Sequence, residues 1–319
     1  MHIKSLSVEE IQAMRDQQTA SSKKPTGGGV SIGFIGLGVM GQPMALNLAA
    51  AGARLVVWNR SATRSEPLRL AGASVAASAD EVFARTRVVF LMLVNEAAID
   101  EVLCRGTSRF AELVADHIVV SMGSTSPEYS MALGADIRAA RGRYVESPVS
   151  GSRKPAEAGQ LVALLGGDAS TIGEIRPLLQ PMCRETVHCG PVGHGMLMKL
   201  SINLHLNTML VGLAEAVHFA SRRGLDLRRF SDAIAAGPLA CDVTRVKLPK
   251  FIERDFAVQA AAEDALNSCR LIGAAARSAG IASPMLDLST QLYADAVTAG
   301  SGRLDMICVI QAIEARTQR

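Results

Sequence analysis

The chain has 319 residues, of which 49% are hydrophobic, 20% charged and 4% aromatic, and its formal net charge is +3. The composition supplies enough aliphatic side chains for a large core and excludes general disorder, while the length favours two domains over one. The charge is spread without a long basic run. A nucleic-acid-binding protein needs Lys and Arg clustered on one face, so the sequence argues against that class.

Cysteine usage and hydropathy bear on the compartment. The six cysteines, at positions 104, 183, 189, 241, 269 and 308, form no CxxC pair, which is typical of a reduced, intracellular protein. The sequence contains no run of about 18 apolar residues, so it predicts no membrane-spanning helix. The nearest approach, Leu197–Val211, is interrupted by Lys199 and Asn203. Residues 1–29 lack the apolar core of a secretion signal. We therefore expect a cytoplasmic protein that does not cross a membrane.

The first 29 residues differ in composition from the rest. They hold a short helical candidate, Val8–Gln18, followed by the linker TASSKKPTGGG, whose small polar residues, Pro and three Gly are typical of a flexible connection. We expect residues 1–29 to form a tail outside the fold, and the alternative is an arm that binds a partner.

Between residues 30 and 193, short apolar runs alternate with helical stretches such as Pro43–Ala51. The predicted strands are Ser31–Ile35, Leu55–Trp58, Val88–Val94, Ile118–Ser121, Tyr144–Glu146, Leu161–Leu165 and Thr186–His188. Strands that alternate with helices predict parallel βαβ units with right-handed crossovers.

The strand pattern stops after about Gly195, and helical patterns broken by Gly and Pro follow. The predicted helices are Met196–Arg222, Arg228–Ala236, Ala257–Ala279 and Met285–Ala299. We expect residues 194–319 to form an all-helical domain.

A glycine-rich turn joins the first strand to the first helix. In Gly36-x-Gly38-x-x-Gly41 the glycines permit a tight turn, close approach of the backbone to a pyrophosphate, and close packing of helix on strand. The positive helix end favours phosphate oxygens. The context favours a dinucleotide site over a plain structural turn, and predicts an α/β Rossmann domain over residues 30–193. The expected contacts are Gly36, Leu37, Gly38, Val39, Met40 and Gly41.

The end of the second strand bears on which dinucleotide binds. An NAD-binding site normally has Asp or Glu there for the ribose hydroxyls. This chain has Asn59, Arg60 and Ser61, with Arg64 close behind. No carboxylate repels a 2′-phosphate, and the guanidinium groups can bind one. The alternative is that these arginines are ordinary solvated residues at a helix start. The pattern favours NADP(H) over NAD(H).

Lys199, Asn203 and Asn207 are spaced four residues apart, so they share one face of a helix whose neighbouring positions are apolar. Desolvation disfavours the charged form of a half-buried lysine and lowers its pKa. Such a lysine can give a proton to a developing alkoxide and recover it later. The alternative is a lysine at a domain hinge whose charged end reaches solvent.

Three segments together resemble the β-hydroxyacid dehydrogenase family, which includes 3-hydroxyisobutyrate dehydrogenase and glyoxylate/succinic semialdehyde reductase. They are FIGLGVMGQPMALNL, ESPVSGSRKPAEAGQL and the spacing Gly195-x-x-x-Lys199-x-x-x-Asn203. The resemblance covers residues 31–315. The WNR end of the second strand and SGSRKPAE are most similar to the glyoxylate/succinic semialdehyde reductase branch.

The resemblance implies roles for the matching residues. Lys199 is expected to be the general acid/base, and Asn203 to hold the substrate or orient the lysine. Ser150 and Gly151 are expected to bind the substrate carboxylate through hydroxyl and backbone donors. Ser152, where many members have glycine, either narrows the pocket or is a simple turn residue.

Two further segments match the family imperfectly. In Ser121–Pro127, where relatives contact the nicotinamide ribose, the hydroxyl pair aligns either with Gly123 and Ser124 or with Ser124 and Thr125, so Ser124 is the common candidate.

The second imperfect match is a C-terminal F…KD pattern that closes over the site in relatives. Phe256 and Asp264 fit it, but Glu263 replaces the lysine that reaches the cofactor. The reversed charge is expected to weaken cofactor binding unless Glu263 points away or another cation substitutes.

No metal is expected, because the spacing of Cys183, His188, Cys189 and His194 fits no common zinc pattern. The expected protein transfers a hydride between NADPH and a small carboxylate-bearing aldehyde, keto acid or hydroxyacid, as a homodimer or homotetramer built through the helical domain. Two alternatives stay open. Imine reductases share the architecture but generally lack a lysine at position 199. A non-catalytic NADP-binding scaffold is expected to have lost Lys199 or Asn203, and both are present, but Glu263 keeps this alternative open.

Overall fold

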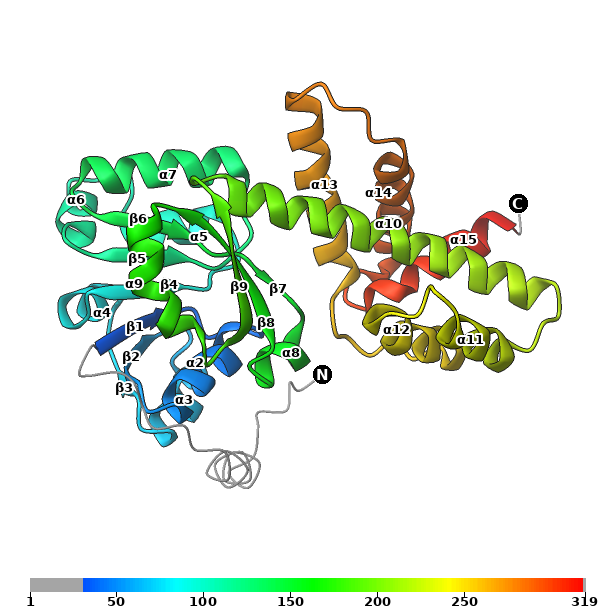
Figure 1. Ribbon diagram of the computed structural model, residues 1–319, viewed down its shortest axis with the longest axis horizontal. Coiled ribbons are helices and arrows are strands. Elements are labelled where there is room, and N and C mark those ends of the chain that lie inside the picture. Colours follow the sequence, from blue (N-terminus) through cyan, green and yellow to red (C-terminus); the bar gives the residue numbers. More distant parts are fainter. Residues whose placement is uncertain (1–30, 318–319) are drawn as a thin grey trace. The chain divides into compact units, whose positions relative to one another are not determined.

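The computed structural model describes residues 31–317, in two compact units that divide between Lys199 and Leu200, inside one long helix (Figure 1). Each unit is described by itself. The predicted tail of residues 1–29, including Val8–Gln18, lies outside the described residues.

The first unit is built on a sheet. Within the described residues its strands are β1 (Ser31–Ile35), β2 (Arg54–Trp58), β3 (Ser74–Val75), β4 (Val88–Leu91), β5 (Ile118–Ser121), β6 (Arg143–Glu146), β7 (Val149–Ser150), β8 (Leu161–Gly167) and β9 (Cys183–Gly190). The order is β3-β2-β1-β4-β5-β6-β8-β7, with β9 beside β8. From β3 to β6 every pairing is parallel, and the order 3-2-1-4-5-6 is that of a Rossmann fold. The predicted fold class is confirmed.

The expectation of parallel strands is wrong at the far edge of the sheet. There β8 runs antiparallel to β6 and to β7, while β9 is parallel to β8. Residues 151–160 join β7 to β8, and this connection is shorter than the dozen or so residues that a parallel crossover needs. The two-residue strands β3 and β7 were not predicted, because so short a run carries no periodicity.

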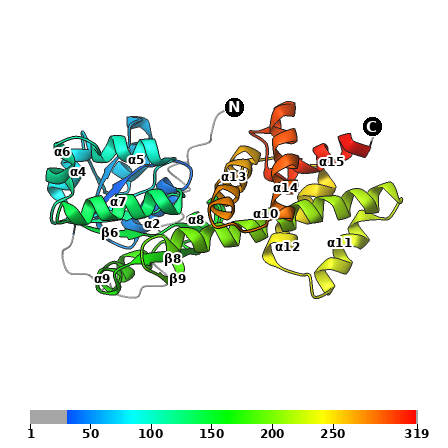
Figure 2. The same ribbon diagram turned by 90° about the horizontal axis from the view of Figure 1, so that it is seen from above.

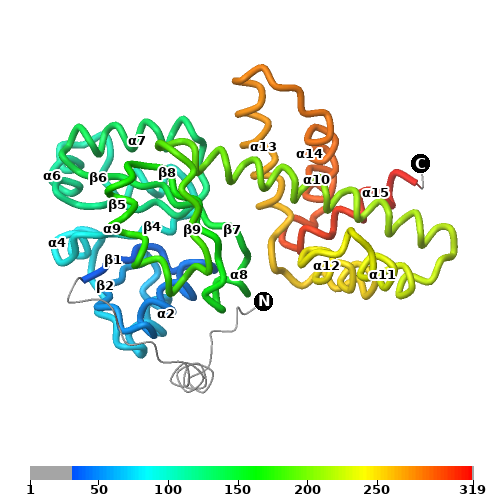
Figure 3. Tube along the Cα trace, in the orientation of Figure 1, coloured from blue at the N-terminus to red at the C-terminus, as the bar shows by residue number. Residues whose placement is uncertain are grey.

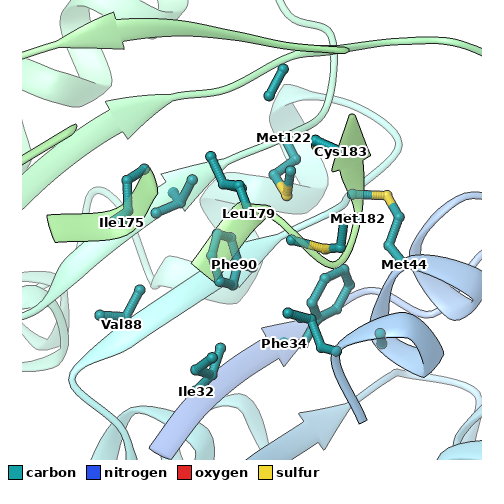
Figure 4. Close-up of a cluster of buried hydrophobic side chains, with 14 of the residues drawn as sticks. Ile32, Phe34, Met44, Val88, Phe90, Met122, Ile175, Leu179, Met182 and Cys183 are labelled. Carbon is teal, nitrogen blue, oxygen red and sulfur yellow. The ribbon is translucent and has the colours of Figure 1, made fainter. Parts of the chain in front are cut away.

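Helices cover both faces of the sheet (Figure 2). They are α2 (Gly41–Ala50), α3 (Glu66–Leu70), α4 (Ala79–Arg85), α5 (Glu96–Leu103), α6 (Arg109–Val114), α7 (Pro127–Ala139), α8 (Arg153–Glu157) and α9 (Ala169–Leu179), with a 3-10 turn, η1 (Ala62–Ser65), before α3. Successive strand residues point to opposite faces, so Phe34 packs with α2, α3, α8 and α9, and Ile35 packs with α4 to α7. Figure 4 shows the first of these cores, where Phe34 and Phe90 face Met44 and Leu179.

The chain passes from β9 directly into α10 (His194–Arg222), which can be followed in the tube of Figure 3. Of the described helices, α10 alone has the length and mean hydropathy, 1.2, that a membrane span needs. Long core helices of soluble proteins meet the same criterion. Leu210, Val211, Ala214 and Val217 of α10 lie in the core of the second unit, which accounts for much of its apolar character.

The second unit is helical throughout its described residues. After α10 come α11 (Leu227–Ala236), α12 (Asp242–Glu253), α13 (Ala262–Ser278), α14 (Pro284–Ala296), η2 (Val297–Ser301), η3 (Met306–Cys308) and α15 (Val309–Thr317). Their apolar faces enclose a core around the fully buried Tyr293.

Two helix predictions in this unit need correction. The helix predicted from Ala257 begins only at Ala262, because the buried Asp305 carboxylate accepts the backbone N–H groups of Gln259 and Ala260 and holds that segment out of the helix. Helix α12 was not predicted. Pro249 and two lysines interrupt its apolar pattern, and Lys247 is buried only because Asp305 pairs with it at 2.8 Å.

Candidate functional site: a dinucleotide turn and a desolvated lysine

The glycine-rich turn follows β1 as predicted. Gly36 has φ +97°, in the left-handed region, and its N–H donates to the Trp58 carbonyl at 3.1 Å. A Cβ on Gly36 would lie 2.2 Å from the Met92 carbonyl oxygen, and one on Gly41 would lie 1.9 Å from the Gly36 oxygen. Both glycines are therefore required for the turn to form.

Gly38 has a different surrounding. It is exposed, and a Cβ placed on it would meet nothing within 4 Å. Helix α2 starts three residues later, and no side chain caps it. Open space over a glycine, beside uncapped helix-start amides, fits a diphosphate that approaches the backbone closely. The exposed Val39 and half-buried Met40 complete this turn, whereas Leu37 is buried in the core.

Asn59 fastens the end of β2 to the turn. Its Oδ1 accepts the Leu37 N–H at 2.9 Å, and its Nδ2 donates to the Ser61 carbonyl at 3.0 Å. The predicted cofactor contact at Asn59 thus has a structural role in addition.

Two arginines follow Asn59. Arg60 is exposed and Arg64 half-buried, and within residues 31–317 neither guanidinium group pairs with a carboxylate. The Arg64 backbone carbonyl accepts from Gln42 Nε2 at 3.1 Å, which ties this segment to α2. Two guanidinium groups without a carboxylate partner in residues 31–317 therefore follow the end of β2, the strand that pairs with β1 ahead of the turn, and such groups are suited to bind a phosphate.

The loop after β5 carries the next candidates. Ser124 is exposed, whereas the hydroxyls of Ser121 and Thr125 are buried and have no hydrogen-bond partner within the described residues. Of the alternatives for the ribose contact, Ser124 is the hydroxyl most open to a ligand.

The predicted carboxylate-binding segment begins where β7 ends. Ser150 is the last residue of β7, and Gly151 has φ +128°. A Cβ on Gly151 would lie 2.7 Å from Leu161 Cδ2, so glycine is required on both counts. Ser152 takes the position before α8 without a side-chain capping bond. The hydroxyls of Ser150 and Ser152 have no hydrogen-bond partner in the described part of the chain.

Lys199 lies in the second turn of α10 and is half-buried. Burial lowers its pKa from the ordinary 10.5 to about 8, because desolvation disfavours the ammonium form. No carboxylate among residues 31–317 forms an ion pair with it, and desolvation is the only cause of the shift. A lysine in this state can both give and take a proton near neutral pH.

The two asparagines that share its helical face are engaged with α13. Asn203 Nδ2 donates to Ser268 Oγ at 3.0 Å, and the buried Asn207 donates to Cys269 Sγ at 3.3 Å. The side-chain amide nitrogen of Asn203 is therefore held within the second unit. Its Oδ1 accepts no hydrogen bond from the described residues.

Phe256, Glu263 and Asp264 all belong to the second unit. Phe256 is half-buried, with the Arg254 guanidinium 5.5 Å from its ring centroid. Glu263 and Asp264 are exposed in the first turn of α13, where a helix N-terminus favours negative charge. Although the Asp264 side chain reaches solvent, desolvation of its carboxyl by the surrounding residues, and then the charge of Glu263, raise its pKa. Glu263 therefore lies where the helix dipole favours its charge, beside a carboxylate that disfavours it.

The residues that the structure describes hold no cluster of His, Cys, Asp or Glu able to bind a metal. Sequence reasoning gave no role to Glu146, which the structure places wholly buried at the end of β6, against the start of α10. A carboxylate directly after the apolar pair Tyr144 and Val145 was the signal that could have found it.

Comparison with known proteins identifies the family of this chain. Residues 31–190 match the family described as the NAD binding domain of 6-phosphogluconate dehydrogenase, and residues 193–313 match that described as NAD-binding of NADP-dependent 3-hydroxyisobutyrate dehydrogenase. The chain is 30% identical to glyoxylate/succinic semialdehyde reductase 2 of Arabidopsis thaliana over 303 residues, 95% of this chain and 85% of that protein.

Two solved structures of related proteins have a similar fold. The Mycobacterium tuberculosis 3-hydroxyisobutyrate dehydrogenase with L-serine has a TM-score of 0.81 and 26% identity, covering 89% of this chain and 99% of that one. Psf3 in complex with NADP⁺ and 2-OPP has a TM-score of 0.79 and 25% identity, over 88% and 99%. The chain therefore belongs to the β-hydroxyacid dehydrogenase family of nicotinamide-dependent oxidoreductases, to which 3-hydroxyisobutyrate dehydrogenase belongs.

Proposed function

We propose that the protein is an NADPH-dependent reductase of a small aldehyde or keto acid that carries a carboxylate, with Lys199 as the proton donor. The observation that carries the proposal is Lys199 itself, which forms no ion pair within the described residues and whose pKa burial lowers to about 8. The Arabidopsis relative is named for glyoxylate and succinic semialdehyde, both of which bear a carboxylate, and this supports the substrate class.

The residues would divide the chemistry as follows. NADPH, when bound, supplies a hydride to the carbonyl carbon. The Lys199 ammonium donates a proton to the carbonyl oxygen as negative charge develops there, and the neutral amine then regains a proton from solvent. Ser150 and Gly151 hold the substrate carboxylate through hydroxyl and amide donors, which fixes the carbonyl for reaction. In the direction of oxidation, neutral Lys199 accepts the proton instead.

A substrate panel tests the proposal directly. Glyoxylate, succinic semialdehyde, methylmalonate semialdehyde and a cyclic imine would each be mixed with the protein and either NADPH or NADH, and loss of nicotinamide absorbance followed. Turnover of one or more carboxylate-bearing carbonyls with NADPH is expected. Turnover of the imine alone would identify an imine reductase, and NADPH binding without any turnover would identify a non-catalytic scaffold.

The choice of NADPH is supported by Arg60 and Arg64, which lack carboxylate partners in residues 31–317. In the double variant Arg60→Ala/Arg64→Ala we expect the Kd for NADPH to rise about 10- to 100-fold, since a charged hydrogen bond contributes about 1.5–3 kcal/mol. The Kd for NADH is expected to stay within about twofold. Fluorescence titration measures both. Arg69→Ala is the matched control, because Arg69 is exposed nearby and already paired with Glu66 at 2.6 Å. Equal losses for the two cofactors would contradict the assignment.

We also propose a homodimer or homotetramer assembled through the helical unit. Large apolar side chains on α10 support it, among them Phe219, which is 65% exposed. Light scattering on purified protein tests the proposal, and a monomeric mass would contradict it.

A further inference from the structure

Glu146, the last residue of β6, is wholly buried, yet its carboxylate is fully hydrogen-bonded. Oε1 accepts the backbone N–H groups of Gly193, Gly195 and Met196 at 2.8, 2.7 and 3.2 Å. Oε2 accepts the Ser130 hydroxyl at 2.5 Å. All of these residues lie in the first unit.

The three N–H groups belong to the start of α10. The first amides of a helix have no partner within it, and the positive end of the helix dipole favours an anion. Burial raises the pKa of Glu146, while its four hydrogen bonds act in the opposite direction. The carboxylate therefore serves as the N-terminal cap of α10, supplied from the sheet rather than from the preceding loop.

The surrounding backbone is shaped to admit this carboxylate. Gly166 pairs with Glu146 across β6 and β8, and a Cβ on Gly166 would lie 2.2 Å from Oε1. A Cβ on Gly195 would lie 2.6 Å from the Leu164 carbonyl oxygen and 3.1 Å from Oε1. Any side chain at either glycine would displace the carboxylate or the helix start.

We propose that Glu146 is a positioning residue for the reaction: by holding the first turn of α10 against the sheet, it fixes where Lys199 presents its amine. Lys199 follows Met196 by three residues, about one helical turn, so a displacement of the cap carries over to the lysine. A misplacement of about 1 Å in an active site can cost about a hundredfold in rate. The inference rests on the proposed role of Lys199.

Two substitutions of Glu146 distinguish the effect of its side-chain length from the effect of its negative charge. Glu146→Gln removes the charge but keeps an acceptor oxygen at the same distance, and the Ser130 hydroxyl can rotate to accept from the new amide. Glu146→Asp keeps the charge but withdraws the oxygens by about 1.5 Å, the length of one C–C bond. We expect kcat to stay within about fivefold of wild type in the Gln variant and to fall about 10- to 100-fold in the Asp variant. The Kd for NADPH is expected to change by less than about twofold in both.

Gly166→Ala tests the same contact without changing Glu146, because the added Cβ would displace the Glu146 Oε1 atom. Gly166 does not have a positive φ, so alanine is compatible with its backbone. Its kcat is expected to fall as in the Asp variant. Gly173→Ala in α9 is the matched control, since a Cβ there meets nothing within 4 Å, and its kcat should be unchanged.

The closing experiment measures kcat, the Kd for NADPH, and amide hydrogen exchange of residues 193–199, at a temperature where circular dichroism shows each variant folded. Faster exchange confined to residues 193–199, together with lower kcat and unchanged NADPH affinity in Glu146→Asp, would support the proposal. Unchanged kcat despite faster exchange would overturn it, as would unchanged exchange.

A wrong assignment of the proposed function can be distinguished from a wrong role for Glu146. If Lys199 is not the proton donor, Lys199→Ala keeps full activity. Amide exchange still reports whether Glu146 holds the start of α10. If Glu146→Asp does not fold, Ser130→Ala replaces it. That variant removes one of the four hydrogen bonds, and its kcat is expected to fall about two- to fivefold. An unchanged kcat would overturn the proposal.

Discussion

Lys199→Met is expected to lower turnover about a hundredfold or more, the usual scale for removing a general acid, while the Kd for NADPH stays within about twofold. Methionine keeps an unbranched apolar side chain as long as the lysine stem and lacks the amine. Steady-state kinetics and fluorescence titration measure the two quantities. Arg222→Met is the control, because it removes an exposed cation near the other end of the same helix. Equal turnover in Lys199→Met and wild type would reject the assigned role.

The pKa of Lys199 also predicts the pH dependence. Reduction needs the ammonium form, so its rate is expected to fall as the pH rises through about 8, whereas oxidation needs the neutral amine and should accelerate through the same range. The residual activity of Lys199→Met should show neither the fall in the rate of reduction nor the rise in the rate of oxidation across this pH range. A rate of reduction that stays flat to pH 10 would contradict the assignment.

The same lysine reduces the stability of the folded chain near neutral pH. Its folded pKa of about 8 lies below the ordinary 10.5, so between these values the unfolded chain binds more protons. The free energy of unfolding of wild type should therefore rise with pH across this window. Lys199→Met lacks the cost of burying the charge. It is expected to be the more stable protein at pH 7, with the difference shrinking as the pH approaches 10.5, which urea denaturation at several pH values would measure.

Gly41→Ala carries the second large effect. The added Cβ would lie 1.9 Å from the Gly36 carbonyl oxygen, and since that oxygen belongs to the backbone, no side-chain movement relieves the overlap. We expect a loss of about 3 kcal/mol in the free energy of unfolding, the upper end of the usual cost of overpacking. Urea denaturation measures it, and an unchanged midpoint would contradict the role of this glycine.

Gly38→Ala is the matched control for that variant. A Cβ at Gly38 meets nothing within 4 Å, so the free energy of unfolding is expected to change by no more than about 0.5 kcal/mol. The same Cβ would occupy space that a diphosphate needs to approach the backbone. We therefore expect the Kd for NADPH to rise about tenfold or more, since even 1.4 kcal/mol of lost binding energy is a factor of ten. The pair separates the glycine that folds the turn from the glycine that admits the ligand.

The sequence by itself determined the features that depend on interactions between residues close together in the chain. The glycine spacing after an apolar strand defined the dinucleotide turn, because φ above zero and close backbone approach are demands on single residues. The alternation of β1, β4 and β5 with helices defined the parallel half of the sheet. The apolar neighbours of Lys199 at helical spacing predicted that this part of the helix packs against the rest of the fold, where burial desolvates the amine.

The tertiary structure alone decided what depends on residues far apart in the chain. The antiparallel edge at β8 follows from a short connection that no periodicity records. Lys247 is buried in α12 only because it pairs with Asp305, which lies 58 residues later in the chain. Glu146 becomes the cap of α10 only when folding brings β6 to amides 47 to 50 residues away. A buried charge without partners lowers stability and shifts its pKa, as at Lys199, whereas Lys247 and Glu146 are stabilised by partners that sequence spacing does not show.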